Sequence, residues 1–519
     1  MGNKRCWCGR EAIVNSKTGL CVFHAPNDEK EARVFWQAFN ELYQRALEKR
    51  ANNDTDDNEV IKMNCCGFVF PKFGFGEFPK EVPFLMNFTR AVFEFGADFS
   101  NIVFLEDVYF DSAYFGGPPT EGETIERRIN TNLANHIAAR FYKSTFQSLV
   151  RFCDTEFYCP AIFRRTSFVN TGNSSAEFIG TIFYSEAIFS GSSFIEPAQF
   201  YGVLFGGKTE FIETCFSSCV EFDYAIFKGK TDFDSAESGT GISFNRAILE
   251  NILSLSHLAS KHEKDEFGER VRGPWGYPIP IEREVRLLFQ NCDPKPGAKM
   301  KFNGTTLKYA TFANTPKLED FHTFDFEGAV WKDADDKRKI VFDEVLAEEE
   351  ENGGPTYEET AEVYRRLRLN YESRLAYEFA SDFHVGQMLM MLKSLNKRNP
   401  KKWFLWLYRY VSNFGESVGR PLLWFGGLWL LFSFLWSFNG FAYNGGKVNF
   451  DLAWPWLMSP DFEMAKDVGR CLLYSFKTFL TLPDLKGGVI SQTIGAVQRL
   501  AGASVITLFI LALRRAFRR

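Results

Sequence analysis

The sequence lacks most of the features that assign a protein to a class directly. Cysteine is sparse, with 11 in 519 residues, and this excludes a small disulfide scaffold. The formal net charge is −5, so the basic excess of a dedicated nucleic-acid binder is absent and no nucleic-acid partner is expected. The N-terminus does not predict a signal peptide. The sequence contains no Walker A loop, nucleophile elbow, H-E-x-x-H motif or strand-linked G-x-G-x-x-G, and we therefore expect no enzymatic activity.

Phenylalanine is the residue in excess, with 57 in 519. A content this high predicts a packed protein rather than a disordered one. The rings recur at intervals that alternate between five and six residues. The alternation is unbroken through the longest run and recurs in two shorter ones: Phe178, Phe183, Phe189, Phe194, Phe200, Phe205, Phe211, Phe216, Phe222, Phe227 and Phe233; Phe88, Phe93, Phe99, Phe104, Phe110 and Phe115; and Phe141, Phe146, Phe152, Phe157, Phe163 and Phe168.

These intervals fit neither the 3.6-residue period of a helix nor the two-residue period of an ordinary strand. They fit a coil that turns a corner every five or six residues and points one ring inward on each side. Small residues two positions before many rings, such as Ala161, Ala187 and Ala225, leave room for those rings. Stacked coils of this kind bury a continuous aromatic column. Short half-buried strands with accidental phasing are the less favoured alternative.

Three segments carry a resemblance to a known family. FDSAYF (110–115), FCDTEF (152–157) and FYSEAIF (183–189) resemble the motifs of pentapeptide-repeat proteins, and the resemblance covers residues 68–249 and 300–331. It implies a mainly β fold, a right-handed quadrilateral β-helix, and is nearly silent about activity.

We place the β-helix at 68–332, with insertions at 116–140 and 250–299 and with Trp331 as a lid at its end. The family's simplest period is five residues. Every second interval in this sequence has six residues, one more than that period. We expect a corner or bulge to accommodate the additional residue.

A separate module precedes the column. Cys6, Cys8, Cys21 and His24 follow the pattern C-x-C-x12-C-x2-H, which predicts a tetrahedral structural zinc site. One residue between the first two cysteines is fewer than usual, and the alternative is a set of reduced thiols that pack as small apolar groups. We assign the zinc-binding module and a following helix to residues 1–50 and a linker to 51–67.

Helices are expected after the column. Residues 333–355 are charged and end in GGP, which predicts a linker. Thr356 and Glu359 form a capping box that opens a helical hairpin at 356–396. His384 lies in this hairpin, where a lone histidine is expected to be a hydrogen-bonded structural residue. A basic amphipathic juxtamembrane segment follows at 397–420.

The end of the chain predicts a transmembrane hairpin at 421–519. Residues 421–438 contain no charge and are long enough to span a bilayer core. The second span, 500–513, must extend back to Thr493, and a re-entrant or interfacial helix is the alternative for it. Residues suited to anchor these spans at the membrane interfaces are Trp403, Trp406, Trp424, Trp436, Arg514 and Arg515.

Charge predicts the topology. Residues 439–490 carry five basic and five acidic residues, whereas the outer ends of the two spans are basic. The flanking residues are Lys397, Arg398, Lys401, Lys402, Arg409, Arg420, Arg514, Arg515, Arg518 and Arg519. The positive-inside rule then predicts that the N-terminal domains and the C-terminus of this multi-pass protein lie in the cytoplasm. We expect the membrane to be a bacterial inner (cytoplasmic) membrane.

A short apolar segment at 470–482 lies between the spans and is expected to be re-entrant. This order is similar to that of two-transmembrane, ion-channel-like domains. No Thr-Val-Gly-Tyr-Gly filter is present, so potassium selectivity is not implied. Candidate pore or vestibule residues are Ser475, Lys477, Thr478, Thr481 and Arg499. For the charged members, snorkelling to the interface is an equally weighted alternative.

The predicted function is that of an oligomeric, channel-like membrane protein with a cytoplasmic β-helical column. The alternative is a membrane-anchored scaffold that binds a protein partner through the column. A DNA mimic that modulates topoisomerases is less favoured, because residues 68–249 hold 22 acidic residues interspersed with 14 basic ones. The expected partners are the lipid bilayer, further copies of the chain and a protein on one face of the column.

Overall fold

A computed structural model describes residues 5–13, 17–51, 61–72, 78–169, 175–260, 286–289, 292–313, 324–335, 337–349, 354–439, 441–443, 446–448, 462–480 and 489–517. The chain forms two compact units, Met1–Pro355 and Thr356–Arg519.

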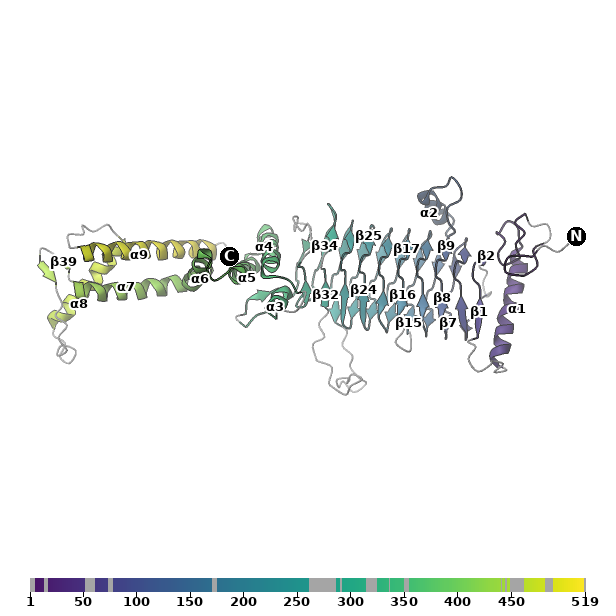
Figure 1. Ribbon diagram of the computed structural model, residues 1–519, viewed down its shortest axis with the longest axis horizontal. Coiled ribbons are helices and arrows are strands. Elements are labelled where there is room, and N and C mark those ends of the chain that lie inside the picture. Colours follow the sequence, from purple (N-terminus) through teal and green to yellow (C-terminus); the bar gives the residue numbers. More distant parts are fainter. Residues whose placement is uncertain are drawn as a thin grey trace. The chain divides into compact units, whose positions relative to one another are not determined.

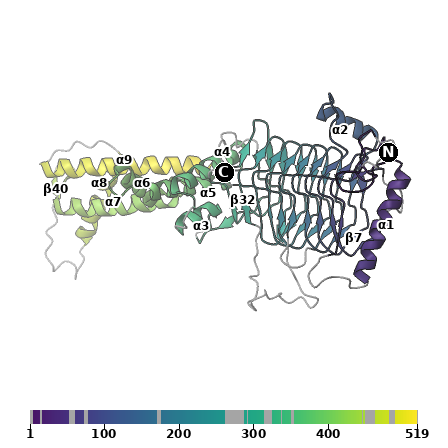
Figure 2. The same ribbon diagram turned by 45° about the vertical axis from the view of Figure 1, so that its right-hand side comes forward.

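The first unit is a column of short strands stacked in four parallel sheets, which Figures 1 and 2 show from two directions. Each sheet is named here by its first strand. The β1 sheet contains β1 (Lys62–Asn64), β4 (Leu85–Asn87), β8 (Val108–Tyr109), β12 (Val150–Arg151), β16 (Ala176–Glu177), β20 (Ala198–Gln199), β24 (Cys219–Glu221), β28 (Gly241–Ser243), β32 (Arg286–Leu288) and β35 (Ala310–Thr311). The β2 sheet contains β2 (Val69–Phe70), β5 (Val92–Phe93), β9 (Tyr114–Phe115), β13 (Glu156–Phe157), β17 (Ile182–Phe183), β21 (Leu204–Phe205), β25 (Ile226–Phe227), β29 (Ile248–Leu249) and β33 (Asp293–Pro294).

The other two sheets complete the four sides. The β3 sheet contains β3 (Glu81–Val82), β7 (Val103–Phe104), β11 (Thr145–Phe146), β15 (Ser167–Phe168), β19 (Ser193–Phe194), β23 (Cys215–Phe216), β27 (Glu237–Ser238) and β31 (Ala259–Ser260). The β6 sheet contains β6 (Ala97–Asp98), β10 (Ala139–Arg140), β14 (Ala161–Ile162), β18 (Ala187–Ile188), β22 (Thr209–Glu210), β26 (Thr231–Asp232), β30 (Ile252–Ser254), β34 (Lys299–Lys301) and β36 (Phe324–Asp325).

The periodic phenylalanines form the interior of the column. Each ring stacks nearly parallel on the equivalent ring of the next coil, as for Phe178 on Phe200 (4.7 Å between centroids, 7°) and Phe200 on Phe222 (4.9 Å, 16°). These rings are fully buried. The prediction of a mainly β, four-sided helical column with ring-filled coils is confirmed, and burial of the rings is its main stabilising force.

The corners explain the alternating spacing. In a five-residue interval the chain closes a tight turn, in which Ser144 N donates to Phe141 O (3.1 Å) and Lys143 takes a φ of 57°. A positive φ at the third position is typical of a type II turn. Gly180 occupies the same corner position (φ 67°). The six-residue intervals make wider corners, so the extra residue lies there.

The coil continues through most of the insertion expected at 250–299. In that range β30, β31, β32, β33 and the start of β34 all pair with neighbouring strands, and only residues 261–285 and 290–291 lie outside the described part. Leu255 and Leu258 are buried inside the column there. Aliphatic side chains thus replace the rings in coils that otherwise continue. The spacing of the phenylalanines therefore did not predict these coils. The insertion at 116–140 holds α2 (Ile125–Ala134), and the column resumes at Ala139.

Both ends of the column are covered by helices. The helix α1 (Ala32–Ala51) lies across the first coil (Figure 1), where Phe35 and Phe39 pack on Phe70 at 5.2 and 5.8 Å. The linker expected at 51–67 contains β1 near its end. Edge strands need such covers because their free N–H and C=O groups otherwise pair with other chains.

The opposite end is closed by residues that were expected to form the linker 333–355. They contain the antiparallel pair β37 (Lys332–Asp333) and β38 (Lys339–Ile340) and the helix α3 (Phe342–Glu348). Trp331 is buried against Phe326 (5.5 Å). The buried Asp343 carboxylate accepts hydrogen bonds from the N–H groups of Phe312 and Ala313 (3.0 and 2.8 Å), which lie at the end of the β1 sheet. Long-range capping of this kind leaves no periodic signal in the sequence.

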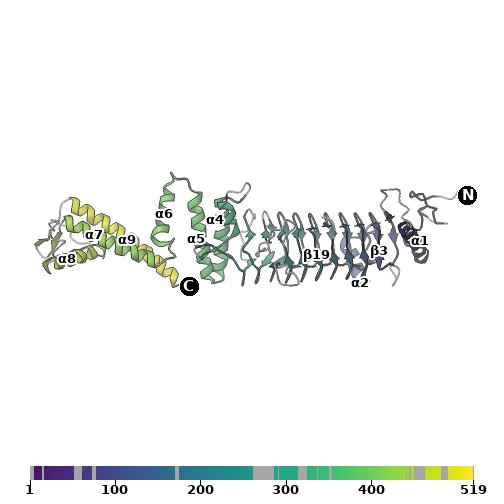
Figure 3. The same cartoon turned by 90° about the horizontal axis from the view of Figure 1, so that it is seen from below.

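The second unit is helical. The helices α4 (Tyr357–Ser373) and α5 (Tyr377–Ser394) form a hairpin that opens with the expected Thr356–Glu359 capping box. The remaining elements are α6 (Pro400–Ser412), α7 (Gly419–Asn439), the antiparallel pair β39 (Phe441–Tyr443) and β40 (Gly446–Val448), α8 (Phe462–Leu480) and α9 (Val489–Ala516). Figure 3 shows α7 and α9 side by side. These two helices are long and apolar enough to cross a membrane.

Candidate functional site

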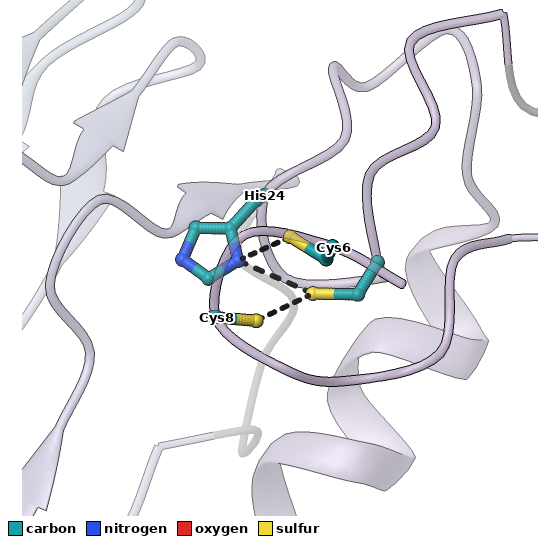
Figure 4. A group of neighbouring side chains, drawn as sticks. Cys6, Cys8 and His24 are labelled. Atoms are coloured by element: carbon teal, nitrogen blue, oxygen red, sulfur yellow. Dashed lines mark hydrogen bonds between the residues drawn. The ribbon is translucent and has the colours of Figure 1, made fainter. Parts of the chain in front are cut away.

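The four predicted metal ligands meet at one point of the N-terminal module. Their ligand atoms all lie within 4.8 Å of one another. Cys6 Sγ is 3.6 Å and Cys21 Sγ 3.2 Å from His24 Nδ1, and Cys8 Sγ is 3.6 Å from Cys21 Sγ; Figure 4 shows the labelled side chains converging. Bonds of about 2.0 Å to nitrogen and 2.3 Å to sulfur in a tetrahedral site separate ligand atoms by about 3.5–3.8 Å. The cluster has the size required to hold a metal ion.

Two tight turns position these ligands. In the first turn, Gly9 N donates to Cys6 O (2.8 Å), and Gly9 has a φ of 83°. In the second turn, the N–H groups of His24 and Ala25 both donate to Cys21 O. The first turn brings Cys6 and Cys8 to one point although a single residue separates them. The short C-x-C spacing is therefore compatible with two ligands of the same ion.

His24 is oriented by a group that the sequence did not reveal. Its Nδ1 faces the sulfur atoms, while Nε2 lies 3.2 Å from the carbonyl oxygen of Cys66. A metal-bound histidine typically donates its second ring N–H to a carbonyl or carboxylate, which fixes the tautomer and the ring plane. Here the backbone of Cys66, at the start of the column, serves as this acceptor. The contact joins residues 42 positions apart, so no local pattern predicts it.

The environment favours a thiolate at Cys6. Burial opposes ionisation of this thiol, but the backbone N–H groups of Cys8 and Cys21 outweigh that effect and lower its pKa to about 6. Thiolates are the form of cysteine that binds metal ions. This is a second property, besides geometry, that the cluster shares with metal sites.

The cluster sits directly on the column. Val69 N donates to Phe23 O (2.8 Å), and Phe23 stacks on Phe68 of the first coil (4.4 Å). Lys30, between the cluster and the column, donates to Val69 O. A metal ion bound here would therefore fix the N-terminal cover of the column, which is a structural role.

The predicted membrane anchors fall into two groups. On α6, Trp403 and Trp406 are 67% and 49% exposed, and Trp424 at the start of α7 is 36% exposed, as expected for interfacial side chains. Trp436 is only 1% exposed and lies in the core between the helices, so its ring packs against protein. Arg514 is exposed, whereas Arg515 donates hydrogen bonds to Phe414 O and Glu416.

The segment expected at 470–482 is part of the longer helix α8, which contacts both α7 and α9. Of the candidate pore residues, Ser475 and Thr478 are fully buried between the helices, and Lys477 is exposed. Arg499 is half-buried and donates to Gly495 O (3.0 Å). Thr481 lies outside the described residues. Ser475 and Thr478 therefore face the helix interface within one chain.

A buried glutamine that the sequence analysis did not single out ties the helices together. Gln498 Oε1 accepts from Trp436 Nε1 (2.7 Å), and its Nε2 donates to Ser475 O and Oγ (2.9 Å each). Every polar atom of this side chain is used. A buried, fully bonded amide of this kind fixes the register of packed helices. Its only signal in the sequence is one polar residue inside an apolar helix.

Comparison with protein-family models, with curated proteins and with solved structures finds no match.

Proposed function

We propose that this protein is a membrane-anchored scaffold of the pentapeptide-repeat type that binds a protein partner along one outer side of its column. The rings fill the interior, so the column acts through its outer surface. The two long apolar helices α7 and α9 support the anchoring. The exposed aromatic residues and the lysines of α6 suit the surface of an anionic bilayer next to them.

One outer side of the column differs from the other three, and this observation carries the proposal. The outward residues of the β2 sheet pair in register from coil to coil, and nearly all of them are apolar: Val69, Val92, Tyr114, Glu156, Ile182, Leu204, Ile226 and Ile248. We call this set the apolar row. Each member is half-buried by its neighbours and retains solvent exposure.

The equivalent positions of the other sheets carry mostly polar or charged residues. The corresponding row of the β6 sheet contains Asp98, Arg140, Ile162, Ile188, Glu210, Asp232, Ser254 and Lys301. A flat apolar strip bordered by charged sides is typical of a protein interaction surface. The partner is therefore expected to present an apolar helix face or strand.

The helix α2 lies beside the apolar row. It follows β9 of the β2 sheet, and buried Asn132 fastens it by donating to Gly116 O and Tyr158 O (3.1 and 2.8 Å). Ile125 and Leu133 of this helix are 40% and 45% exposed. These two exposed residues add apolar side chains to those of the row.

Site-specific photo-crosslinking in cells tests the proposal. A photoreactive residue at Leu204 should give a discrete adduct, and Ile226→Arg should abolish it. A photoreactive residue at Ile188, equally half-buried in the β6 sheet, is the control for the first step, and Ile188→Arg is the control for the second. The fold should tolerate both substitutions, because Arg140 and Arg151 already occupy equivalent outward positions. No adduct at Leu204, or equal adducts from both sides, contradicts the proposal.

We further propose that the metal of the N-terminal cluster is zinc. Three thiolates and one imidazole in tetrahedral reach are a donor set that zinc prefers, and a closed site without a free position is structural. The purified full chain should contain one zinc per chain by metal analysis. Cys21→Ser should lose it, while Cys219→Ser, outside the cluster, should retain it. A metal-free wild-type chain purified under reducing conditions contradicts the assignment.

An oligomeric channel is the second candidate function, and the position of α8 favours it. Phe479 of α8 packs between Phe425 of α7 and Gly502 of α9, where a Cβ atom would lie 2.2 Å from the ring. A further helix held between two spans is the order of two-span channels. Conductance in planar bilayers that changes on Lys477→Gln would support a channel; a monomer in detergent without conductance would support the scaffold alone.

A further inference from the structure

A cavity of about 150 Å³ that is open to solvent on one side lies in the helical unit. Its walls are the α4–α5 hairpin, the turn after α6 and the last turn of α9. Arg368, Glu372 and His384 face it from the hairpin, Glu416 from the turn, and Arg515 from α9. These elements are far apart in the sequence, and nothing in the scaffold proposal uses the cavity.

The histidine supplies a hydrogen-bond donor to this cavity. His384 is 6% exposed, and its Nδ1 lies 3.1 Å from Arg368 Nη1. A guanidinium can only donate, so Nδ1 is the acceptor and the proton of the neutral ring is on Nε2. Among the described residues, Nε2 has no hydrogen-bond partner of normal geometry, and the carbonyl of Phe414 near it already accepts from Arg515. Burial, reinforced by Arg515 and Arg368, lowers the pKa of His384 to about 4, which keeps the ring neutral.

Two guanidinium groups and two carboxylates line the cavity, and only one of the carboxylates is buried. Glu416, whose side chain is 9% exposed, is bound by Arg515 Nη1 (2.9 Å) and by Ser381 Oγ (2.6 Å). Glu416 is therefore the one buried carboxylate of the lining. Glu372 is 47% exposed at the rim and 3.6 Å from Arg368 Nε, too far for a hydrogen bond. In the described part of the chain the buried Nε of Arg368 forms this ion pair with Glu372 but has no hydrogen-bond partner.

Buried donors that lack a hydrogen-bond partner and lie beside guanidinium groups favour an acceptor of negative charge. We propose that this cavity binds a phosphate-type oxyanion between Arg368, His384 and Arg515. Two sources offer that chemistry: free phosphate, or the headgroup of an anionic lipid. The lipid source rests on the proposed membrane anchoring, because a span that ends at Arg515 places the cavity at the level of the headgroups.

Thermal unfolding of the full chain in detergent tests the first source. Inorganic phosphate should raise the melting temperature in a saturable way at constant ionic strength. His384→Phe and Arg515→Gln should each weaken the apparent affinity at least about 10-fold, since a hydrogen bond to a charged group contributes about 1.5–3 kcal/mol. Arg514→Gln is the matched control, because this exposed neighbour does not line the cavity, and it should leave the affinity unchanged.

The second source is tested by reconstituting the same proteins in phosphatidylcholine with or without a minority of phosphatidic acid. Stabilisation by phosphatidic acid that is lost in Arg515→Gln and kept in Arg514→Gln assigns a lipid headgroup. The measured quantity is the change in melting temperature when ligand is added. A variant that is less stable but still folded therefore still shows whether it binds the ligand. If Arg515→Gln does not fold, Arg515→Lys takes its place, because lysine keeps the positive charge but lacks the paired N–H donors of the guanidinium group.

A wild-type chain that neither ligand stabilises overturns the proposal, and so do equal losses in Arg514→Gln and Arg515→Gln. Neither measurement involves the apolar row, so failure here is distinguishable from failure of the scaffold function.

Discussion

Removing one interior ring should weaken the column more than almost any other single change. Phe205 is fully buried, and its ring lies between those of Phe183 (5.4 Å) and Phe227 (5.0 Å). Phe→Ala in a core costs about 3–5 kcal/mol, depending on how far the site collapses. Here collapse is resisted, because Gly206 N donates to Phe183 O (2.7 Å) and Lys228 N donates to Phe205 O (2.9 Å). We therefore expect about 4–5 kcal/mol for Phe205→Ala.

Hydrogen exchange of the full chain measures this loss where it occurs. A repeat column opens locally, so the amides of Gly206 and Lys228 should exchange about 1,000-fold faster, which corresponds to about 4 kcal/mol. Phe205→Leu should cost only about 1–2 kcal/mol. The structure itself accepts leucine in this ring stack, because Leu249 pairs in register with Phe227.

Tyr201→Ala is the control on the outer surface of the same coil, where this side chain is 45% exposed. Its effect should stay within about 1 kcal/mol. An increase in exchange of less than about tenfold for Phe205→Ala would refute the assignment of the ring stack as the stabilising core.

Three further predictions concern the ends of the column and the topology. Removing metal with a strong chelator should speed exchange of the Val69 amide, which bonds Phe23 O, at least about tenfold and leave the central coils unchanged, because the cluster fixes only the first coil. Burial raises the pKa of Asp343 from 3.8 to about 6, so the folded state binds more protons and stability should fall as pH rises from 4 to 6. In chemical unfolding at several pH values this fall, about 3 kcal/mol at most, should be present in the wild type and absent in Asp343→Asn. In whole cells an impermeant thiol reagent should label Tyr443→Cys and spare Phe517→Cys, with the wild type as background; the opposite result would reverse the topology.

The sequence alone determined the features that depend on local repetition or local composition. The alternating five- and six-residue spacing specifies the column because each coil repeats the same packing of a ring against the ring below. The Cys/His cluster could also be predicted from the sequence, because its four residues lie within one short segment. The uncharged run of α7 needs only its length and composition to indicate a span.

Tertiary structure decided whatever depends on contacts between distant residues. The coil at 252–260 was missed because leucine fills the interior there without the ring rhythm. Trp436 has the composition of an interfacial residue, yet Gln498, 62 positions later, draws it into the helix core. Asp343 looks like one more charge in a charged segment, and only the folded chain places its carboxylate on the end of the column. Arg368, His384 and Arg515 form one cavity only after three separate elements have packed, because hydrogen-bond partners and burial are properties of the assembled core and not of the local chain.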